Sequence, residues 1–340
     1  MNPYMAYYAA DAKISSKKGK VLDEVRLRRM MECETVDQVA DYIKNKYGLA
    51  GLINDAESNA RLFRDDLEQL MTRYMVRETE EMLHYFSGPY KDFFRVFLMR
   101  FEITDLVMML RKISRNEEPA DVSERFVHSG TYSKLPFDKL AASKNVEQFI
   151  ENLKGTPYYT ALKTVTVNDE VKREFHSEMK LQVLFYKTLM KKAAKLEKKD
   201  FEAVKEIIGT RIDFLNVQWI YRARAYYGIS PERILIYSIQ GGNRLKLRIL
   251  KKLAYSGSVE ELEQLSNRYM RYRIFGNEAE IKKNLDEGFY AYLESRKRDT
   301  SLGKVLWYIY MLDRAIRNMV TVTESIRYRL PRDQMEKYLV

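Results

Sequence analysis

The fold of this chain is decided by one stretch, RIDFLNVQWIYRARAYYG, which covers residues 211–228. Most of its residues are aromatic or apolar, as in a buried helix, yet it contains Asp213, Asn216 and Arg222. At about 100° per residue on an α-helix, Asp213 and Asn216 share a face, whereas Arg222 lies about opposite Asp213. Because an unpaired buried charge is costly, we expect these groups to pair with neighbouring helices. A less favoured alternative is that they line a channel or socket that grips a partner.

The same arrangement of residues recurs along the chain. An apolar residue, any residue, Asp or Asn, and a second apolar residue follow one another in EITDL (102–106), DFLNV (213–217) and AIRNM (315–319). The first copy carries Glu102, Asp105 and Arg111 at the spacing seen in the second, and the third carries Arg317 and Asn318. Recurrence of this kind is a primary sign of a repeat architecture.

Two further markers support three copies. A helix start is expected where Thr, Asn or Ser precedes Val and an acidic residue, since such a side chain caps the free backbone N–H groups and the acid suits the helix dipole. These starts are Thr35-Val36-Asp37, Asn145-Val146-Glu147 and Ser258-Val259-Glu260. A Pro-led acidic turn is expected to close each copy, at Pro119-Ala120-Asp121, Pro231-Glu232 and Pro331-Arg332-Asp333.

The composition predicts an all-α fold. Gly (14) and Pro (7) are scarce, and good helix formers dominate. Long patterns with one apolar and one charged face lie between the markers, at 62–86, 171–199 and 279–297. We therefore predict three similar helical units in tandem, at 1–122, 123–235 and a shortened 236–340.

Charge and composition limit the cellular setting. The net charge of +11 favours acidic partners, namely nucleic acid, anionic lipid or an acidic protein surface. Cys33 is the single cysteine, which fits a reducing compartment. The longest apolar run, VLWYIYML (305–312), is far shorter than the roughly 18 residues of a membrane span. No secretory signal is apparent, so we expect a soluble intracellular protein that can lie against a membrane.

The sequence does not predict an enzyme. His84, His128 and His176 lie far apart without metal-ligand spacing, and no phosphate-binding Gly-x-x-x-x-Gly-Lys-Ser/Thr loop is present. The Gly pair of QGGNRLK (240–246) precedes a basic helix start and is compatible with an anion site, but a helix-breaking turn is the favoured interpretation. We expect no catalytic residue, no metal and no cofactor.

Nearly the whole chain resembles the C subunit of the archaeal and bacterial V/A-type ATPases, a relative of the d subunit of the vacuolar ATPases. The similar stretches are MAYYAADAKI (5–14), EITDLVMMLRKI (102–113), NVEQFIENLKGTPYYTAL (145–162), DFLNVQWIYRAR (213–224) and AIRNMVTVTESIRYRLPRDQMEKYLV (315–340). Asp105 replaces the usual Asn of the family motif, and Val320 stands where Arg is common. The signature residues, with a structural or socket-lining role, are Glu102, Asp105, Arg111, Asp213, Asn216, Arg222, Arg317 and Asn318.

The resemblance implies a fold and a function. The three units would surround a pseudo-threefold axis and form a funnel. The protein would be a non-catalytic rotor component that connects the central stalk, with its D-type and F-type subunits, to the membrane rotor ring of proteolipid subunits. It would transmit torque for ATP-coupled transport of H+ or Na+, lying peripherally on the cytoplasmic side of the membrane.

Two alternatives remain from the sequence. A basic helical-repeat adaptor with another partner would show the same patterns. A nucleic-acid-binding protein would use KKAAKLEKKD (191–200) and SRKRD (295–299) to bind phosphates. Interspersed Glu residues and the lack of a known reading module argue against nucleic acid, because charge runs of this kind are usually solvated faces.

Overall fold

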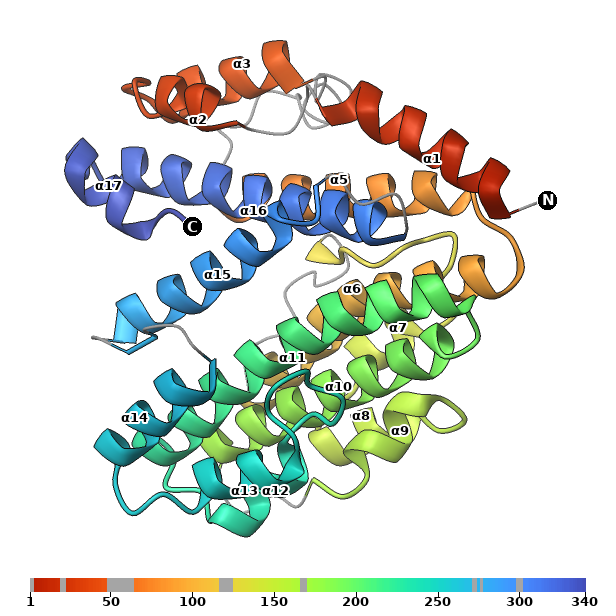
Figure 1. The fold of residues 1–340 in the computed structure, drawn as a ribbon, viewed down its shortest axis with the longest axis vertical. Coiled ribbons are helices and arrows are strands. Elements are labelled where there is room, and N and C mark those ends of the chain that lie inside the picture. Colours follow the sequence, from red (N-terminus) through yellow and green to blue (C-terminus); the bar gives the residue numbers. More distant parts are fainter. Residues whose placement is uncertain are drawn as a thin grey trace. The chain divides into compact units, whose positions relative to one another are not determined.

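The computed structural model describes residues 3–18, 23–47, 64–115, 125–165, 170–270, 274–275, 278–297 and 302–340. Within these ranges the chain forms sixteen helices and no strand, which confirms the predicted all-α class. The helices belong to two compact units (Figure 1). We call Met1–Phe86 with Arg273–Val340 the end unit, and Ser87–Tyr272 the central unit. The three-unit division, the pseudo-threefold axis and the funnel stay predictions.

The end unit is built around one long helix, α16 (Leu302–Arg327), against which its other helices pack. The predicted apolar run 305–312 is its most buried part, and every residue of that run is buried. No described helix is long and apolar enough to cross a membrane. The surrounding helices are α1 (Pro3–Lys18), α2 (Glu24–Met30), α3 (Val36–Tyr47), α5 (Arg64–Leu83), α15 (Glu278–Glu294) and α17 (Arg332–Tyr338).

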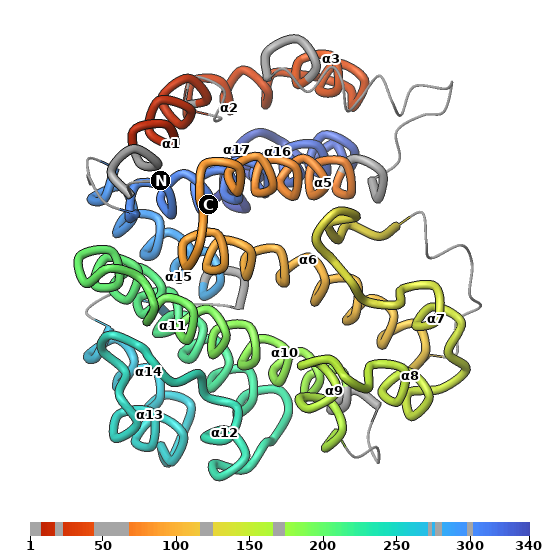
Figure 2. Tube along the Cα trace, turned by 90° about the vertical axis from the view of Figure 1, so that its right-hand side faces the viewer, coloured from red at the N-terminus to blue at the C-terminus, as the bar shows by residue number. Residues whose placement is uncertain are grey.

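The central unit is a stack of three long helices, α6 (Gly88–Ser114), α10 (Glu170–Ala193) and α11 (Lys198–Ala225). Helix α10 packs along α6 and also contacts α11, as Figure 2 shows. The rings of Phe97 on α6 and Phe185 on α10 meet edge to face, with centroids 6.4 Å apart. Shorter helices cover this stack: α7 (Phe137–Ala141), α8 (Val146–Asn152), α9 (Pro157–Leu162), α12 (Pro231–Tyr237), α13 (Leu247–Ala254) and α14 (Val259–Met270).

All three predicted helix starts are confirmed. In the second copy, the Gln148 N–H donates to Asn145 Oδ1 at 2.8 Å, and the Lys144 N–H donates back to Gln148 Oε1 at 2.8 Å. This reciprocal pair resembles a capping box shifted by one residue, and it satisfies two free backbone donors. In the first copy, the Gln38 N–H donates to the Thr35 side chain and the Glu34 N–H donates to the Gln38 side chain. In the third copy, the Glu261 N–H donates to the Ser258 side chain and the Gly257 N–H donates to the Glu261 side chain.

The Pro-led segments are not the closing turns that the sequence predicts. Pro231 is the first residue of α12, and Pro331 is the cap that precedes α17, so both motifs begin a seven-residue helix. Proline suits this position because the first turn of a helix has no partner for its N–H. The remaining motif, Pro119-Ala120-Asp121 of the first copy, lies outside the described residues.

Candidate functional site

The Asp or Asn that recurs in EITDL (102–106), DFLNV (213–217) and AIRNM (315–319) has one structural role at all three places. Asn216 lies fully buried on α11, where its Nδ2 donates to the Ile239 carbonyl at 2.9 Å and its Oδ1 accepts the Ile239 N–H at 2.8 Å. On α16, Asn318 makes the same two bonds with Val340, at 2.9 and 3.0 Å. A side-chain amide can satisfy both groups of one backbone residue because it carries a donor and an acceptor. We call Asp105, Asn216 and Asn318 the pin residues.

The first pin is charged, and its partners differ accordingly. Asp105 lies buried on α6 and accepts the N–H groups of Val127, at 3.1 Å, and His128, at 2.9 Å. A carboxylate only accepts, so the His128 side chain supplies a further partner, with Nδ1 2.8 Å from Asp105 Oδ2. The His128 ring in turn stacks on Phe137, with centroids 3.5 Å apart. Asp105 therefore still joins α6 to a later segment, as the two Asn pins do for their helices, but it accepts all of its hydrogen bonds and donates none.

The three pins hold segments at matching distances along the chain. The bonded residue lies 22 positions after Asp105, 23 after Asn216 and 22 after Asn318. A long helix and the segment that returns to it are thus joined in the same register three times. The sequence pattern predicts which residues recur but not these backbone partners, so the bonds add a shared contact to the recurrence.

A second buried acid secures the loop between α12 and α13. Asp213, one turn before Asn216, accepts the N–H groups of Arg244 at 2.7 Å and Leu245 at 3.0 Å. Burial raises the pKa of Asp213, and the hydrogen bonds from the two N–H groups offset part of that rise. The anion-site interpretation of the Gly pair is not supported by these two N–H groups. They follow the pair and already donate to the Asp213 carboxylate, so they are not free for an external anion.

The glycines of this loop are required by its geometry. Gly241 has a φ of +106°, which side chains rarely adopt. A Cβ at Gly242 would lie 2.1 Å from Asp213 Oδ1, so no larger residue fits beside the carboxylate. The favoured prediction of a helix-breaking turn is confirmed by this backbone conformation.

The predicted arginines of the central unit reach the same part of α10. Arg111 on α6 pairs with Glu174, with Nε 3.3 Å from Oε2. Arg222 on α11 lies over the ring of Phe175, the residue that follows Glu174, at 6.0 Å from the ring centroid. It also lies 5.9 Å from the ring centroid of Tyr227. The two arginines stand at equivalent positions of the repeat and therefore clamp α10 from two neighbouring helices.

Glu102 accepts a hydrogen bond from the hydroxyl of Tyr158 on α9. Burial, and then the Glu102 charge, raise the pKa of Tyr158 far above its ordinary value, so the hydroxyl keeps its proton. The pair attaches α9 to α6.

In the end unit, Arg317 lies in a network of its own. Its guanidinium is 2.9 Å from Asp286 on α15 and 2.9 Å from Asp313 one turn earlier, and it also donates to the Tyr290 hydroxyl. The eight predicted residues are thus distributed over both units. Two pairs of them converge on one segment each: Asp213 and Asn216 on the loop at 239–245, and the two central-unit arginines on adjacent residues of α10. A socket-lining role stays a prediction.

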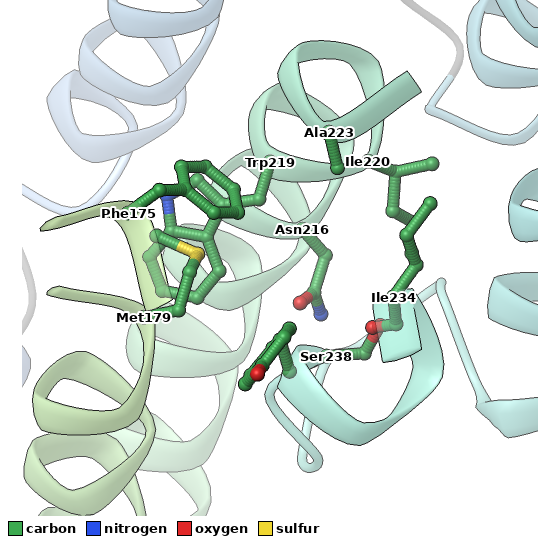
Figure 3. Close-up of a pocket in the computed structure, with 9 residues that line it drawn as sticks. Phe175, Met179, Asn216, Trp219, Ile220, Ala223, Ile234 and Ser238 are labelled. Atoms are coloured by element: carbon green, nitrogen blue, oxygen red, sulfur yellow. The ribbon is translucent and has the colours of Figure 1, made fainter. Parts of the chain in front are cut away.

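A small cavity beside Asn216 shows how tightly this region is packed. It measures about 10 Å³, at the lower limit of the space that one water molecule needs, and apolar side chains line most of it. Figure 3 shows the Asn216 amide pointing toward Ser238 at the end of α12. A cavity of this size does not admit an organic ligand. The lining residues are Phe175, Met179, Asn216, Trp219, Ile220, Ala223, Ile234, Tyr237 and Ser238.

One polar cluster was not predicted from the sequence. Lys17 on α1 is buried and contacts Glu78 at 2.6 Å and Glu81 at 2.6 Å, both on α5. The Tyr308 hydroxyl of α16 donates to Glu78 at 2.9 Å. The partners lie 61 and 230 residues apart, so no local pattern reveals them. This cluster joins three helices of the end unit.

Comparisons with known proteins agree with each other. The family model described as ATP synthase (C/AC39) subunit matches residues 10–338. The C subunit of the A-type ATP synthase of Archaeoglobus fulgidus is 23% identical over 98% of this chain and 96% of its own length. The C subunit of Thermococcus onnurineus is 24% identical over 95% of this chain and 87% of its own length. The C subunit of Methanosarcina mazei is 22% identical over 76% of this chain and 70% of its own length.

Proposed function

Since the chain belongs to the ATP synthase (C/AC39) subunit family, as the C subunit of a V/A-type ATPase, we propose that it is the rotor component that connects the central stalk to the membrane rotor ring. In this role it transmits torque for ATP-coupled transport of H+ or Na+ and performs no chemistry itself. Its partners are the D-type and F-type subunits of the stalk and the proteolipid ring. It lies peripherally on the cytoplasmic side of the membrane.

The observation that carries the proposal is the threefold recurrence of the pins. A torque-carrying connector must resist bending between its two attachment faces. Each pin residue joins a helix of 26 to 28 residues to a segment far along the chain through two or more hydrogen bonds. Segments held in this way lose the freedom of a long connection, which is the property the role needs.

The expected interfaces follow from charge and symmetry. Three similar units can meet a ring of unrelated subunit number only through distributed contacts, and polar contacts tolerate such mismatch better than deep pockets. The net charge of +11 suits an electrostatic face toward the ring. We assign a more apolar socket containing Tyr and Arg to the stalk. Part of the charge that the nucleic-acid alternative would use is compensated within the chain, because Lys192 pairs with Asp92 at 2.6 Å and Lys297 with Glu294 at 3.4 Å.

Two experiments test the role. Tagged chain recovered from detergent-solubilised membranes should bring both stalk and ring subunits with it. Membranes that lack the chain should hydrolyse ATP without building an ion gradient, and adding the purified chain should restore the gradient. Coupled ion transport in its absence, or recovery with neither group of subunits, would refute the proposal.

A raised salt concentration separates the two interfaces. The Debye screening length falls from about 10 Å at 0.1 M salt to about 3 Å at 1 M, so an electrostatic contact with the ring should be released first. The stalk subunits should then stay with the chain while the ring subunits are lost. The reverse order of release would contradict the assignment of the two faces.

A further inference from the structure

The surface of α12, α13 and their connecting loop is basic. It presents six exposed cationic side chains, which are Arg233, Arg244, Lys246, Arg248, Lys251 and Lys252. Helix α13 contains no acidic residue, and α12 contains only Glu232, which accepts the Tyr255 hydroxyl at 2.7 Å. The next acids along the chain, at the start of α14, mark one edge of this surface. We call it the α12–α13 surface.

These cations form no ion pair within 4.0 Å in the described part of the chain. None of the six forms a salt bridge there, whereas other surface lysines of the central unit do, such as Lys154 with Glu151 at 2.8 Å. Lys246 donates to the Gly242 carbonyl, and Lys251 lies over the Tyr255 ring. Lys246 also lies close enough to Asp213 to offset part of the rise that burial causes in the pKa of that carboxyl, so the positive charge that remains available to a partner is that of the other five cations.

Large apolar side chains are exposed among the cations. Ile236 is 71% exposed, Leu247 58% and Tyr255 48%. Single exposed apolar groups are common on protein surfaces, but here they belong to the same short stretch of chain as the cations, a combination that suits a membrane surface. Nucleic acid would use the cations but not Ile236 or Leu247, because phosphate binding gains nothing from aliphatic side chains. A bilayer surface uses both kinds of group.

The surface is held in place by the core of the central unit. On its inner side α13 buries Leu250, Leu253 and Ala254, so the helix is fixed with its basic side outward. Asp213 and Asn216 hold the loop between α12 and α13, and Arg224 donates to the Ala254 carbonyl at 2.7 Å at the end of α13. A preorganised surface binds without an ordering cost.

We propose that the α12–α13 surface binds anionic phospholipid headgroups at a bilayer surface. The cations contact lipid phosphates, while Ile236 and Leu247 enter the boundary between headgroups and acyl chains. This goes beyond the connection of stalk to ring, and the purified chain alone can test it. Each lysine or arginine near an anionic bilayer contributes about a fivefold gain in binding, so three together contribute on the order of 100-fold.

The test is co-sedimentation of the purified full chain with vesicles of phosphatidylcholine, with and without phosphatidylglycerol. The chain should bind only the anionic vesicles. The variant R248Q/K251Q/K252Q should bind them on the order of 100-fold more weakly. The matched control K195Q/K198Q/K199Q removes the same charge from exposed positions of the 195–199 segment and should keep most of the binding. The variant I236S/L247S should bind more weakly while its charge is unchanged.

Several outcomes would overturn the proposal. Equal losses in the R248Q/K251Q/K252Q and K195Q/K198Q/K199Q variants would show that net charge alone drives binding. Equal binding to neutral vesicles would remove the role of the cations. If R248Q/K251Q/K252Q instead lost binding to duplex DNA, or to an acidic protein of the complex, with vesicle binding unchanged, the surface would belong to that partner. Circular dichroism spectra matching the wild type are required of each variant.

Discussion

Replacing Asn216 with alanine should destabilise the central unit by about 3 kcal/mol. The change leaves the N–H and C=O of Ile239 without their partners in a fully buried position. Each unsatisfied buried backbone group costs about 1–3 kcal/mol, which gives a range of about 2–6 kcal/mol for the pair. The adjacent cavity of about 10 Å³ would grow enough to admit a water, which places the expected value in the lower half of that range.

The two tryptophans of the chain provide a separate signal for each unit. Trp219 lies in the central unit beside Asn216, and Trp307 lies in the end unit. Urea unfolding in a W307F background, followed by Trp219 fluorescence, therefore reports on the affected unit alone. The exposed neighbour Gln240 supplies the control, since Q240A should change the free energy of unfolding by less than about 0.5 kcal/mol.

An isosteric variant separates the hydrogen bonds from the cavity. N216D keeps the size of the side chain, but its carboxylate cannot donate to the Ile239 carbonyl, so it should also destabilise the unit at neutral pH. Stability of N216A equal to that of Q240A would refute the pin as an energetic feature. Loss in N216A with none in N216D would assign the effect to packing alone.

The remaining predictions concern caps, loop and pH. Alanine at each helix cap, Thr35, Asn145 or Ser258, should cost about 1 kcal/mol in urea unfolding. Trp219 fluorescence reports the two central-unit caps, and Trp307 fluorescence reports the Thr35 cap of the end unit. G242A should cost about 1–3 kcal/mol by overpacking against Asp213, whereas G130A, with nothing within 4 Å of its Cβ, should be nearly neutral. Burial alone would raise the pKa of Glu81, but Lys17 lowers it overall below its ordinary 4.5, so the end unit should lose stability as pH falls below that value. K17M should weaken this pH dependence, as measured by Trp307 fluorescence.

The helix starts show how far local chemistry can be read from sequence. The Asn145 cap and the bond that Lys144 returns to Gln148 connect residues at most four positions apart. Such bonds form whenever the helix forms, so residue type and spacing predict them. The amphipathic patterns and the scarcity of Gly and Pro predict the all-α class for the same reason.

The pins show where this reasoning ends. The sequence marks Asp105, Asn216 and Asn318 as recurring polar residues, and we expected charged or polar partners on neighbouring helices. Their partners include backbone groups of segments 22 or 23 residues later. Every backbone residue offers the same two groups, so sequence carries no sign of which one is chosen.

The sequence by itself determined the helical class, the capped helix starts, the recurrence of the pin residues and membership of the ATP synthase (C/AC39) family. Tertiary structure alone decided the buried cluster of Lys17, Glu78 and Tyr308, and the end unit that combines both ends of the chain. The reason is physical: helix periodicity and capping depend on residues within a turn or two of one another. Burial and long-range pairing depend on which surfaces meet once the whole chain has folded.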